Sequence, residues 1–171
     1  GPDAPQSGAG RAARNRAMAR EASQPREPSR EILELLPHRQ PFLFVDEVVE
    51  YDRDNRRLKA LKTITGKEDF FRGHYPGRPV MPGVLLCESV FQAGALLAAM
   101  MLRESEAGEP AGEPLLVRIQ NARFRSPVRP GAVLEITVEL TEKVSQAWYM
   151  AGYITSGGKR ILRVEFSVTV T

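Results

Sequence analysis

The most prominent hydrophobic pattern in the chain is a long apolar segment that begins near Val80 and ends near Leu102. From Pro82 to about Glu104 the residues favour a helix, and proline suits the first turn of a helix. A helix that is apolar all round is buried on all sides. In a chain of 171 residues, we therefore expect a sheet to wrap around this helix. The apolar positions leave no polar face: Leu85, Leu86, Val90, Phe91, Ala95, Leu96, Leu97, Met100 and Met101.

Strand patterns flank the helix on both sides. Residues 42–51 are rich in β-branched and aromatic side chains, residues 56–65 alternate loosely, and the turn residues between them predict a hairpin. After the helix, the Gly157-Gly158 pair predicts a second hairpin. This order indicates an α+β protein in which an antiparallel six-stranded sheet curls around one long central helix, the hot-dog fold. The four strands expected after the helix cover about residues 115–126, 132–142, 146–156 and 160–171.

The N-terminal region has a different composition. Residues 1–29 are rich in Gly, Ala, Pro, Ser, Gln and Arg and have almost nothing to bury, which predicts a disordered basic tail. Its first two residues are typical of the scar left by tag removal. Ser29 suits the N-cap of a short helix over residues 30–36. We expect residues 30–171 to form a single domain.

Charge is concentrated near the N-terminus. Residues 1–30 carry six Arg against three acidic residues, and the other 141 residues carry 18 basic and 18 acidic side chains. A neutral folded domain lacks the basic stripe that nucleic-acid binding requires.

The apolar segment is interrupted by Pro82, Glu88 and Gln92, and burying these groups in a bilayer would cost several kcal/mol. We therefore expect a buried helix, no membrane insertion and a cytoplasmic protein. With one cysteine and two histidines, the chain has no internal disulfide and no zinc cluster.

One segment carries residues suited to proton chemistry. His74 lies in a rigid Gly- and Pro-rich loop that leads into the central helix, and imidazole exchanges a proton near neutral pH. Glu88, on the first turns of the helix, faces an apolar interior, where a carboxyl group tends to keep its proton. Gln92 follows on the same helix face, and such a polar pair needs a partner or a ligand. Gly83 leaves a free N–H at the helix N-terminus, which can hold a carbonyl oxygen that gains negative charge.

A base, an acid and an oxyanion donor are the groups needed to remove a proton next to a thioester carbonyl and expel a β-hydroxyl group. The surrounding residues resemble a known family. Residues 74–92, HYPGRPVMPGVLLCESVFQ, are similar to the signature HFPGxPxMPGVLxxEAxAQ of the FabZ-type 3-hydroxyacyl-(acyl carrier protein) dehydratases. Residues 35–48, LLPHRQPFLFVDEV, and residues 121–131, NARFRSPVRPG, resemble two further motifs of that family. Three separated motifs in the right order make the resemblance highly specific, and it covers about residues 31–171.

The resemblance implies a hydro-lyase that reversibly removes water from a (3R)-hydroxyacyl thioester to give a trans-2-enoyl thioester, in fatty-acid or related lipid synthesis. The acyl chain would be carried on the phosphopantetheine of acyl carrier protein, with no other cofactor and no metal. The resemblance also implies a tight homodimer, often a trimer of dimers, in which His74 of one subunit is the base and Glu88 of the other is the acid. The Gly83 N–H would polarise the thioester carbonyl, and Gln92 would orient Glu88. The related FabA-type isomerases use Asp at the acid position, so glutamate favours dehydration without isomerisation.

A few positions depart from the family pattern or need a separate interpretation. Phe91 replaces a small residue and Cys87 stands beside the acid, so both bear on the acyl chain length that the enzyme prefers. Cys87 is itself typical of a small buried hydrophobic residue rather than a nucleophile. Ala132 replaces the Asp that follows the PxPG turn, which we expect to affect the turn and not catalysis. His38 is interpreted as structural, with a packing or capping role.

Three arginines recur near one strand and the turn after it: Arg123, Arg125 and Arg129. Residues 123 and 125 lie on the same face of a strand. The pattern is typical of a solvated sheet edge, and it also suits docking of acyl carrier protein, which is acidic and carries a phosphate.

Two other functions stay open at this point. One is a hot-dog thioesterase, which usually has a carboxylate on the helix but lacks histidine in the HxPG loop. The other is a non-enzymatic homologue that binds acyl carrier protein or scaffolds a synthase, which predicts loss of the His or the Glu. Both His74 and Glu88 are present, and this favours the dehydratase.

Overall fold

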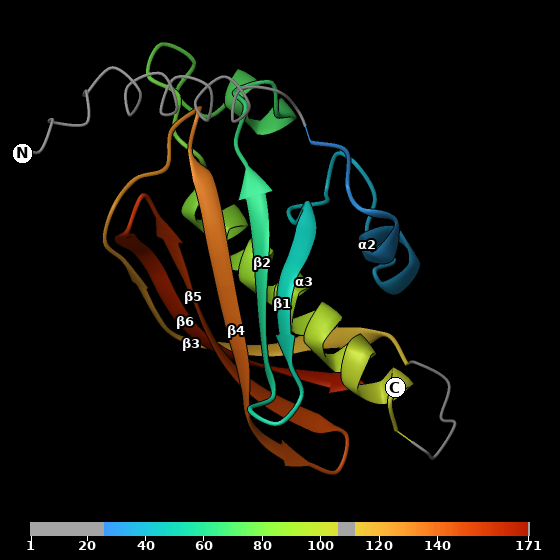
Figure 1. The fold of residues 1–171 in the computed structure, drawn as a ribbon. Coiled ribbons are helices and arrows are strands. Elements are labelled where there is room, and N and C mark those ends of the chain that lie inside the picture. The colour runs from blue at the N-terminus through green and yellow to red at the C-terminus, as the bar shows by residue number, and fades with distance from the viewer. Residues whose placement is uncertain (1–25, 106–111, 171) are drawn as a thin grey trace, which may run out of the picture.

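A long helix packed inside a curled sheet forms the body of the molecule (Figure 1). The structure is a computed structural model and describes residues 26–105 and 112–170, so most of the predicted N-terminal tail lies outside the described residues. Six antiparallel strands form one sheet in the order β1-β2-β4-β5-β6-β3. The predicted six-stranded sheet around one long helix is therefore confirmed. The elements are α2 (Arg30–Leu35), β1 (Glu47–Asp52), β2 (Arg57–Thr63), the 3-10 helix η1 (Asp69–Arg72), α3 (Gly83–Arg103), β3 (Pro114–Phe124), β4 (Val133–Val144), β5 (Ala147–Ser156) and β6 (Lys159–Val170).

Turn residues account for the two predicted hairpins. Between β1 and β2, the two carboxylate oxygens of Asp52 accept hydrogen bonds from Asn55, from its backbone N at 3.0 Å and from its Nδ2 at 2.7 Å. Between β5 and β6, Gly157 and Gly158 have φ of 57° and 79°, the left-handed conformation that a two-residue hairpin turn requires. Both hairpins are present in the antiparallel sheet as predicted.

The first strand is shorter than predicted. Strand β1 begins at Glu47, whereas the sequence pattern predicted a strand from Phe42. The backbone before β1 pairs instead with a side chain of α3: Gln92 Oε1 accepts from Phe44 N at 2.8 Å, and Gln92 Nε2 donates to Phe42 O at 3.0 Å. Residues 43–45 are buried. Their apolar character therefore reflects packing in the core rather than a place in the sheet.

The start of the described chain is attached to the sheet at two points. Ser29 caps α2 as predicted, since its Oγ accepts from Ile32 N at 3.4 Å, and its own backbone N donates to Asp46 O at 2.9 Å. Arg26 forms an ion pair with Glu47 at 2.9 Å. Residues 26–29, which the sequence assigned to the tail, thus contact the folded body.

Helix α3 is the centre of the core. With the exception of Glu88, its residues 86–98 are buried. The helix approaches the sheet closely at Gly152 of β5, where an added Cβ would lie 2.3 Å from Cγ1 of Val90. Val84 is 74% exposed, so the expectation of burial on all sides is wrong at this residue of the first turn. The helix is long and apolar enough to cross a bilayer, but 61% of its most apolar 18-residue window is buried inside the fold.

Strand β3 ends the sheet on one side, with β6 as its neighbour. All of its residues after Pro114 are exposed. An edge strand with exposed apolar side chains is the kind of surface that a second chain covers. The large apolar side chains exposed on this strand are Leu115, Leu116, Val117, Ile119 and Phe124.

A buried ion pair joins the start of β1 to β2. Lys62 Nζ lies 3.0 Å from Asp46 Oδ1, and the two side chains are 8% and 2% exposed. The second carboxylate oxygen, Asp46 Oδ2, accepts a hydrogen bond from Thr63 N at 2.7 Å. Burial raises the pKa of Asp46 above its usual range, while the Lys62 ammonium and the Thr63 N–H oppose that rise. The carboxylate is therefore tolerated in the core because these two donors face it.

Candidate active site

His74 is held in one orientation by the loop between η1 and α3. Its backbone N donates to Phe70 O at 3.0 Å, and its ring packs 4.4 Å from the ring of Tyr75. The ring Nδ1 lies 2.6 Å from the carbonyl oxygen of Val80. Because a carbonyl oxygen accepts hydrogen bonds and cannot donate them, Nδ1 carries the proton in this contact. The other nitrogen, Nε2, is left with a lone pair, which is the form of imidazole that can act as a base.

The loop brings His74 beside the start of α3 in one open cavity. The cavity has a volume of about 390 Å³. Two residues of the predicted site, His74 and Gly83, therefore lie on the same hollow. Its lining residues are His74, Val80, Met81, Gly83, Leu86, Phe124, Arg125, Ser126 and Pro127.

Gly83 is the first residue of α3, and Pro82 before it gives no side-chain cap. The first N–H groups of a helix have no acceptor within the helix, and they carry partial positive charge. A Cβ added at Gly83 would lie 2.9 Å from Cε1 of Phe124. Glycine thus lets β3 pack against the helix N-terminus and also leaves the backbone open to the cavity. The close contact with Phe124 gives glycine a packing role at this position, and the oxyanion-donor role expected from the sequence stays a prediction.

Glu88 is held by Gln92, one helical turn further along α3. Gln92 is 1% exposed, and its Nε2 donates to Glu88 Oε1 at 3.1 Å. The contact expected from their spacing is therefore present. His38, which the sequence analysis interpreted as structural, lies at the same carboxylate, with Nε2 3.6 Å from Glu88 Oε1. No local sequence pattern indicates this contact, because residues 38 and 88 are brought together by tertiary packing alone.

Within one chain, the two predicted catalytic residues belong to separate groups. His74 lies on the cavity at the start of α3, whereas Glu88 contacts His38 and Gln92. Across the described residues, no hydrogen bond or ion pair joins His74 to Glu88. One described chain thus contains both halves of the predicted site without joining them.

Cys87 is the residue next to Glu88 on α3, and its side chain is buried. Burial raises the pKa of the Cys87 thiol to about 11, and the neighbouring Glu88 carboxylate adds to the rise. A thiol of that kind is a poor nucleophile at neutral pH. In the part of the chain that the structure describes, no group of three or more His, Cys, Asp or Glu side chains could hold a metal ion.

We expect Cys87 in the folded protein to react slowly with iodoacetamide at neutral pH. With a thiol pKa of about 11, about one molecule in a thousand carries the thiolate at pH 8. The labelling rate, followed by mass spectrometry, should rise with each unit of pH toward that value. The same chain unfolded in guanidinium is the control and should react at the ordinary rate of a cysteine. Rapid labelling of the folded protein at pH 7 would contradict the prediction.

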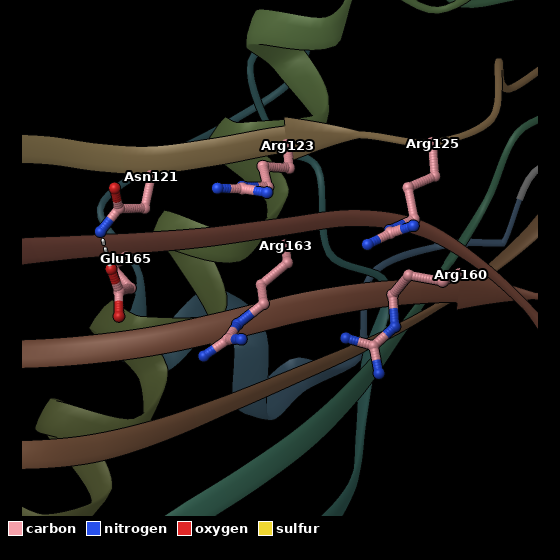
Figure 2. Close-up of a pocket in the computed structure, with 6 residues that line it drawn as sticks. All are labelled: Asn121, Arg123, Arg125, Arg160, Arg163 and Glu165. Atoms are coloured by element: carbon pink, nitrogen blue, oxygen red, sulfur yellow. Dashed lines mark hydrogen bonds between the residues drawn. The ribbon is translucent and has the colours of Figure 1, made fainter.

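Four arginines gather on the sheet near the cavity (Figure 2). Arg123 and Arg125, predicted to share a face, line a hollow of about 690 Å³ together with Arg160 and Arg163 of β6. We call these four residues the arginine cluster. Their hollow is completed by Asn121 and Glu165, which are hydrogen-bonded to each other. Among the described residues, none of the four arginines forms an ion pair.

Arg129, the third predicted docking residue, does not join the arginine cluster. It donates from Nη1 to Pro79 O at 3.2 Å and lines a separate hollow. Arg129 follows the end of β3 and lies at a different hollow from Arg123 and Arg125, and a docking role for the three arginines stays a prediction. Arg160 and Arg163 were missed. They reach the cluster through the pairing of β3 with β6, which sets Arg123 opposite Arg163.

Comparison with known proteins identifies relatives over most of the chain. A family model described as a FabA-like domain matches residues 36–165. The 3-hydroxyacyl-[acyl-carrier-protein] dehydratase FabZ of Anaeromyxobacter dehalogenans (strain 2CP-C) is 48% identical over 135 residues, which are 79% of this chain and 85% of that protein. The FabZ dehydratase of Myxococcus xanthus (strain DK1622) is 45% identical over 141 residues, which are 82% of this chain and 89% of that protein.

Solved structures share the fold at lower sequence identity. The dehydratase heterocomplex ApeI:P from Xenorhabdus doucetiae superposes with a TM-score of 0.69 at 17% identity, covering 82% of this chain and 90% of that chain. The protein smu.793 from Streptococcus mutans UA159, bound to acetyl CoA, gives a TM-score of 0.57 at 12% identity, covering 80% and 95%. These two likenesses concern the fold alone, and they confirm the predicted hot-dog fold. The family match and the two close relatives show that this chain belongs to the FabA-like family, among the FabZ-type 3-hydroxyacyl-[acyl-carrier-protein] dehydratases.

Proposed function

We propose that the chain is a 3-hydroxyacyl-[acyl-carrier-protein] dehydratase that reversibly converts a (3R)-hydroxyacyl thioester into a trans-2-enoyl thioester and water. The observation that carries the proposal is the cavity that His74, with its Nδ1 bonded to the Val80 carbonyl oxygen, lines together with Gly83 at the N-terminus of α3. A base next to a helix N-terminus is the arrangement needed to form an enolate from a thioester. The names of the close relatives support the same reaction.

The proposed mechanism uses three groups of the protein. His74 Nε2 takes a proton from C2 of the acyl chain, and the Gly83 N–H stabilises the negative charge that develops on the thioester oxygen. Glu88 gives its proton to the hydroxyl group on C3. The C3–O bond breaks, the C2–C3 double bond forms and water leaves, so atoms and electrons balance without any cofactor. Before the next turnover, His74 releases the proton that it gained to solvent and Glu88 takes up a proton from solvent.

The site is completed by a second copy of the chain in this proposal. Within one chain His74 and Glu88 lie in separate groups, and the apolar edge of β3 is uncovered beside the cavity that Phe124 lines. A homodimer formed through β3 covers that edge, and it places His74 of one subunit with Glu88 of the other. A closed two-fold interface of this kind produces two equal sites. A trimer of such dimers and a cytoplasmic location, both expected from the sequence, stay predictions.

Acyl carrier protein is the partner that we assign to the arginine cluster. Arg125 lines both the hollow of the cluster and the cavity of His74, so an anion bound by the cluster lies next to the proposed site. Four guanidinium groups without an ion-pair partner among the described residues suit a phosphate or an acidic helix. The phosphopantetheine phosphate and the acidic surface of the carrier supply both kinds of group.

The experiment that tests the function follows a trans-2-enoyl thioester on acyl carrier protein. We expect the conjugated enoyl absorbance to fall as water adds, and the product to gain the mass of one water with its thioester intact. Free thiol would identify a thioesterase instead. No change in the substrate would contradict the proposal and favour a non-enzymatic homologue.

Replacing Arg160 and Arg163 together by glutamine should raise the KM for the carrier-borne substrate by roughly tenfold, because two charges that attract the acidic partner are lost. The KM for the small N-acetylcysteamine thioester should stay unchanged, since that substrate has no carrier. Added salt should reproduce the effect in the unmodified protein, because exposed charges are screened. Arg129→Gln, at a separate hollow, is the matched control. Equal KM changes for both substrates would contradict the docking proposal.

A further inference from the structure

We infer that His38 is a positioning residue for Glu88: its Nε2–H, together with the Gln92 amide, holds Oε1 of the carboxyl group so that the acid proton sits on Oε2. The inference rests on the proposed function, since it concerns the acid of that reaction. It assigns a role in the reaction to a histidine that the sequence analysis interpreted as a packing or capping residue.

The orientation of the Gln92 amide is fixed by the backbone around it. Its Oε1 accepts from Phe44 N at 2.8 Å, and its Nε2 donates to Phe42 O at 3.0 Å. With the oxygen and nitrogen placed in this way, the contact of Gln92 Nε2 with Glu88 Oε1 at 3.1 Å is an N–H donating to an acceptor. Glu88 Oε1 is therefore an acceptor oxygen, and a proton on this carboxyl group belongs on Oε2.

The proton of His38 is placed by the same kind of argument. Its Nδ1 is buried and has no hydrogen-bond partner within the described residues. A buried N–H without an acceptor is unfavourable, so the neutral ring carries its proton on Nε2. That nitrogen lies 3.6 Å from Glu88 Oε1, the oxygen that Gln92 also approaches. Contacts of this kind are often long in a free enzyme and shorten when substrate binds.

The neighbours of His38 hold its ring in place. The ring stacks on Phe42, with centroids 6.4 Å apart and planes at 21°. Arg39 donates from Nη1 to the carbonyl oxygens of His38 and Leu36, both at 2.7 Å, which fixes the loop. Among the described residues, the charged or titratable groups recorded at this histidine are Glu88 from α3 and Arg39 from the loop itself, and the buried thiol Cys87 is the neighbour of Glu88 on α3. Of these, Glu88 is the group within ion-pair distance of the ring, so it is the group that His38 affects.

Two substitutions of His38 distinguish a role in positioning Glu88 from a role in packing alone. His38→Gln keeps an N–H at about the reach of Nε2 but cannot titrate, whereas His38→Phe keeps the aromatic ring on Phe42 and removes the donor. We expect the phenylalanine variant to lose roughly 10- to 100-fold in kcat with little change in KM. Its pH–rate profile should also move its alkaline limb to higher pH, because an N–H aimed at a carboxyl group favours the ionised form. The glutamine variant should restore most of kcat and the position of that limb.

Thermal unfolding of both variants shows whether they fold, and activity is compared for variants that unfold like the unmodified protein. A rate loss in the phenylalanine variant that glutamine reverses supports the inference. Unchanged rates in both variants, or equal losses in both with unmoved pH limbs, overturn it. If the unmodified protein fails to hydrate a trans-2-enoyl thioester, the proposed function is what fails. If the unmodified protein is active and substitutions at residue 38 leave its rate unchanged, the inference about His38 is wrong and the proposed function stands.

Discussion

Replacing His74 with alanine should lower the rate of enoyl-thioester hydration by roughly 10²- to 10⁴-fold, because the reaction loses the base that exchanges a proton with C2. Glu88→Gln should cause a loss of similar size, since glutamine fills the same space but has no acid proton to give. The binding of the acyl chain should change little, so the loss belongs in kcat. Initial rates on a carrier-borne trans-2-enoyl thioester measure both effects.

Mixing the two inactive variants tests whether the site spans two chains. If His74 of one subunit acts with Glu88 of the other, a mixed dimer of His74→Ala and Glu88→Gln contains one intact site and one doubly altered site. Random re-association of equal amounts should then restore about a quarter of the original activity, since half of the dimers are mixed. Each variant mixed with itself is the control. A mixture that stays inactive after demonstrated subunit exchange places both residues in one chain.

Replacing Lys62 with methionine should destabilise the protein by about 3–5 kcal/mol, because it leaves the buried Asp46 carboxylate without its ammonium partner. The ion pair at 3.0 Å is almost fully buried, so water cannot take the place of the missing charge. Unfolding in urea, followed by circular dichroism, gives the free energy of unfolding. The double variant with Asp46→Asn should recover most of the loss, since the neutral amide can still accept from the Thr63 N–H.

The destabilisation should depend on pH in a definite direction. Burial already raises the pKa of Asp46 in the folded protein, and loss of Lys62 removes an opposing charge and raises it further. A carboxyl group whose folded pKa is raised stabilises the fold most below its unfolded value, and the contribution is lost as pH rises through the folded value. The difference between Lys62→Met and the unmodified protein should therefore be largest near pH 7 and shrink as pH falls. Equal stability of the two proteins at pH 7 would show that the ion pair is unimportant.

Local sequence patterns predicted much of the fold and part of the site. Helix α3 follows from its apolar run, the β5–β6 hairpin from Gly157-Gly158, and the contact of Glu88 with Gln92 from their spacing on one helix face. Each of these depends on residues close together in the chain. The period of the hydrophobic residues and the type of the turn residues therefore predict these three features without any knowledge of tertiary contacts.

The features that could not be predicted from the sequence depend on contacts between residues that are far apart in the chain. Arg163 joins Arg123 through the register of β6 against β3, and a register between strands far apart cannot be derived from either strand alone. His38 meets Glu88 because the loop before β1 folds onto α3, where Gln92 binds its backbone. The same loop was mistaken for a strand, since apolar residues that face a helix look like those of a buried strand.

The place of β3 at the sheet edge has a consequence for synthesis on the ribosome. Its partner in the sheet is β6, the last of the six strands in chain order, so β3 has no backbone neighbour until β4, β5 and β6 have been made. During that interval its apolar side chains are available to wrong partners, and long-range strand pairing of this kind is slow and prone to aggregation. A nascent chain stalled before β6 should therefore recruit chaperones, and the proposed dimer through β3 should assemble only after β6, which ends at Val170, has been made.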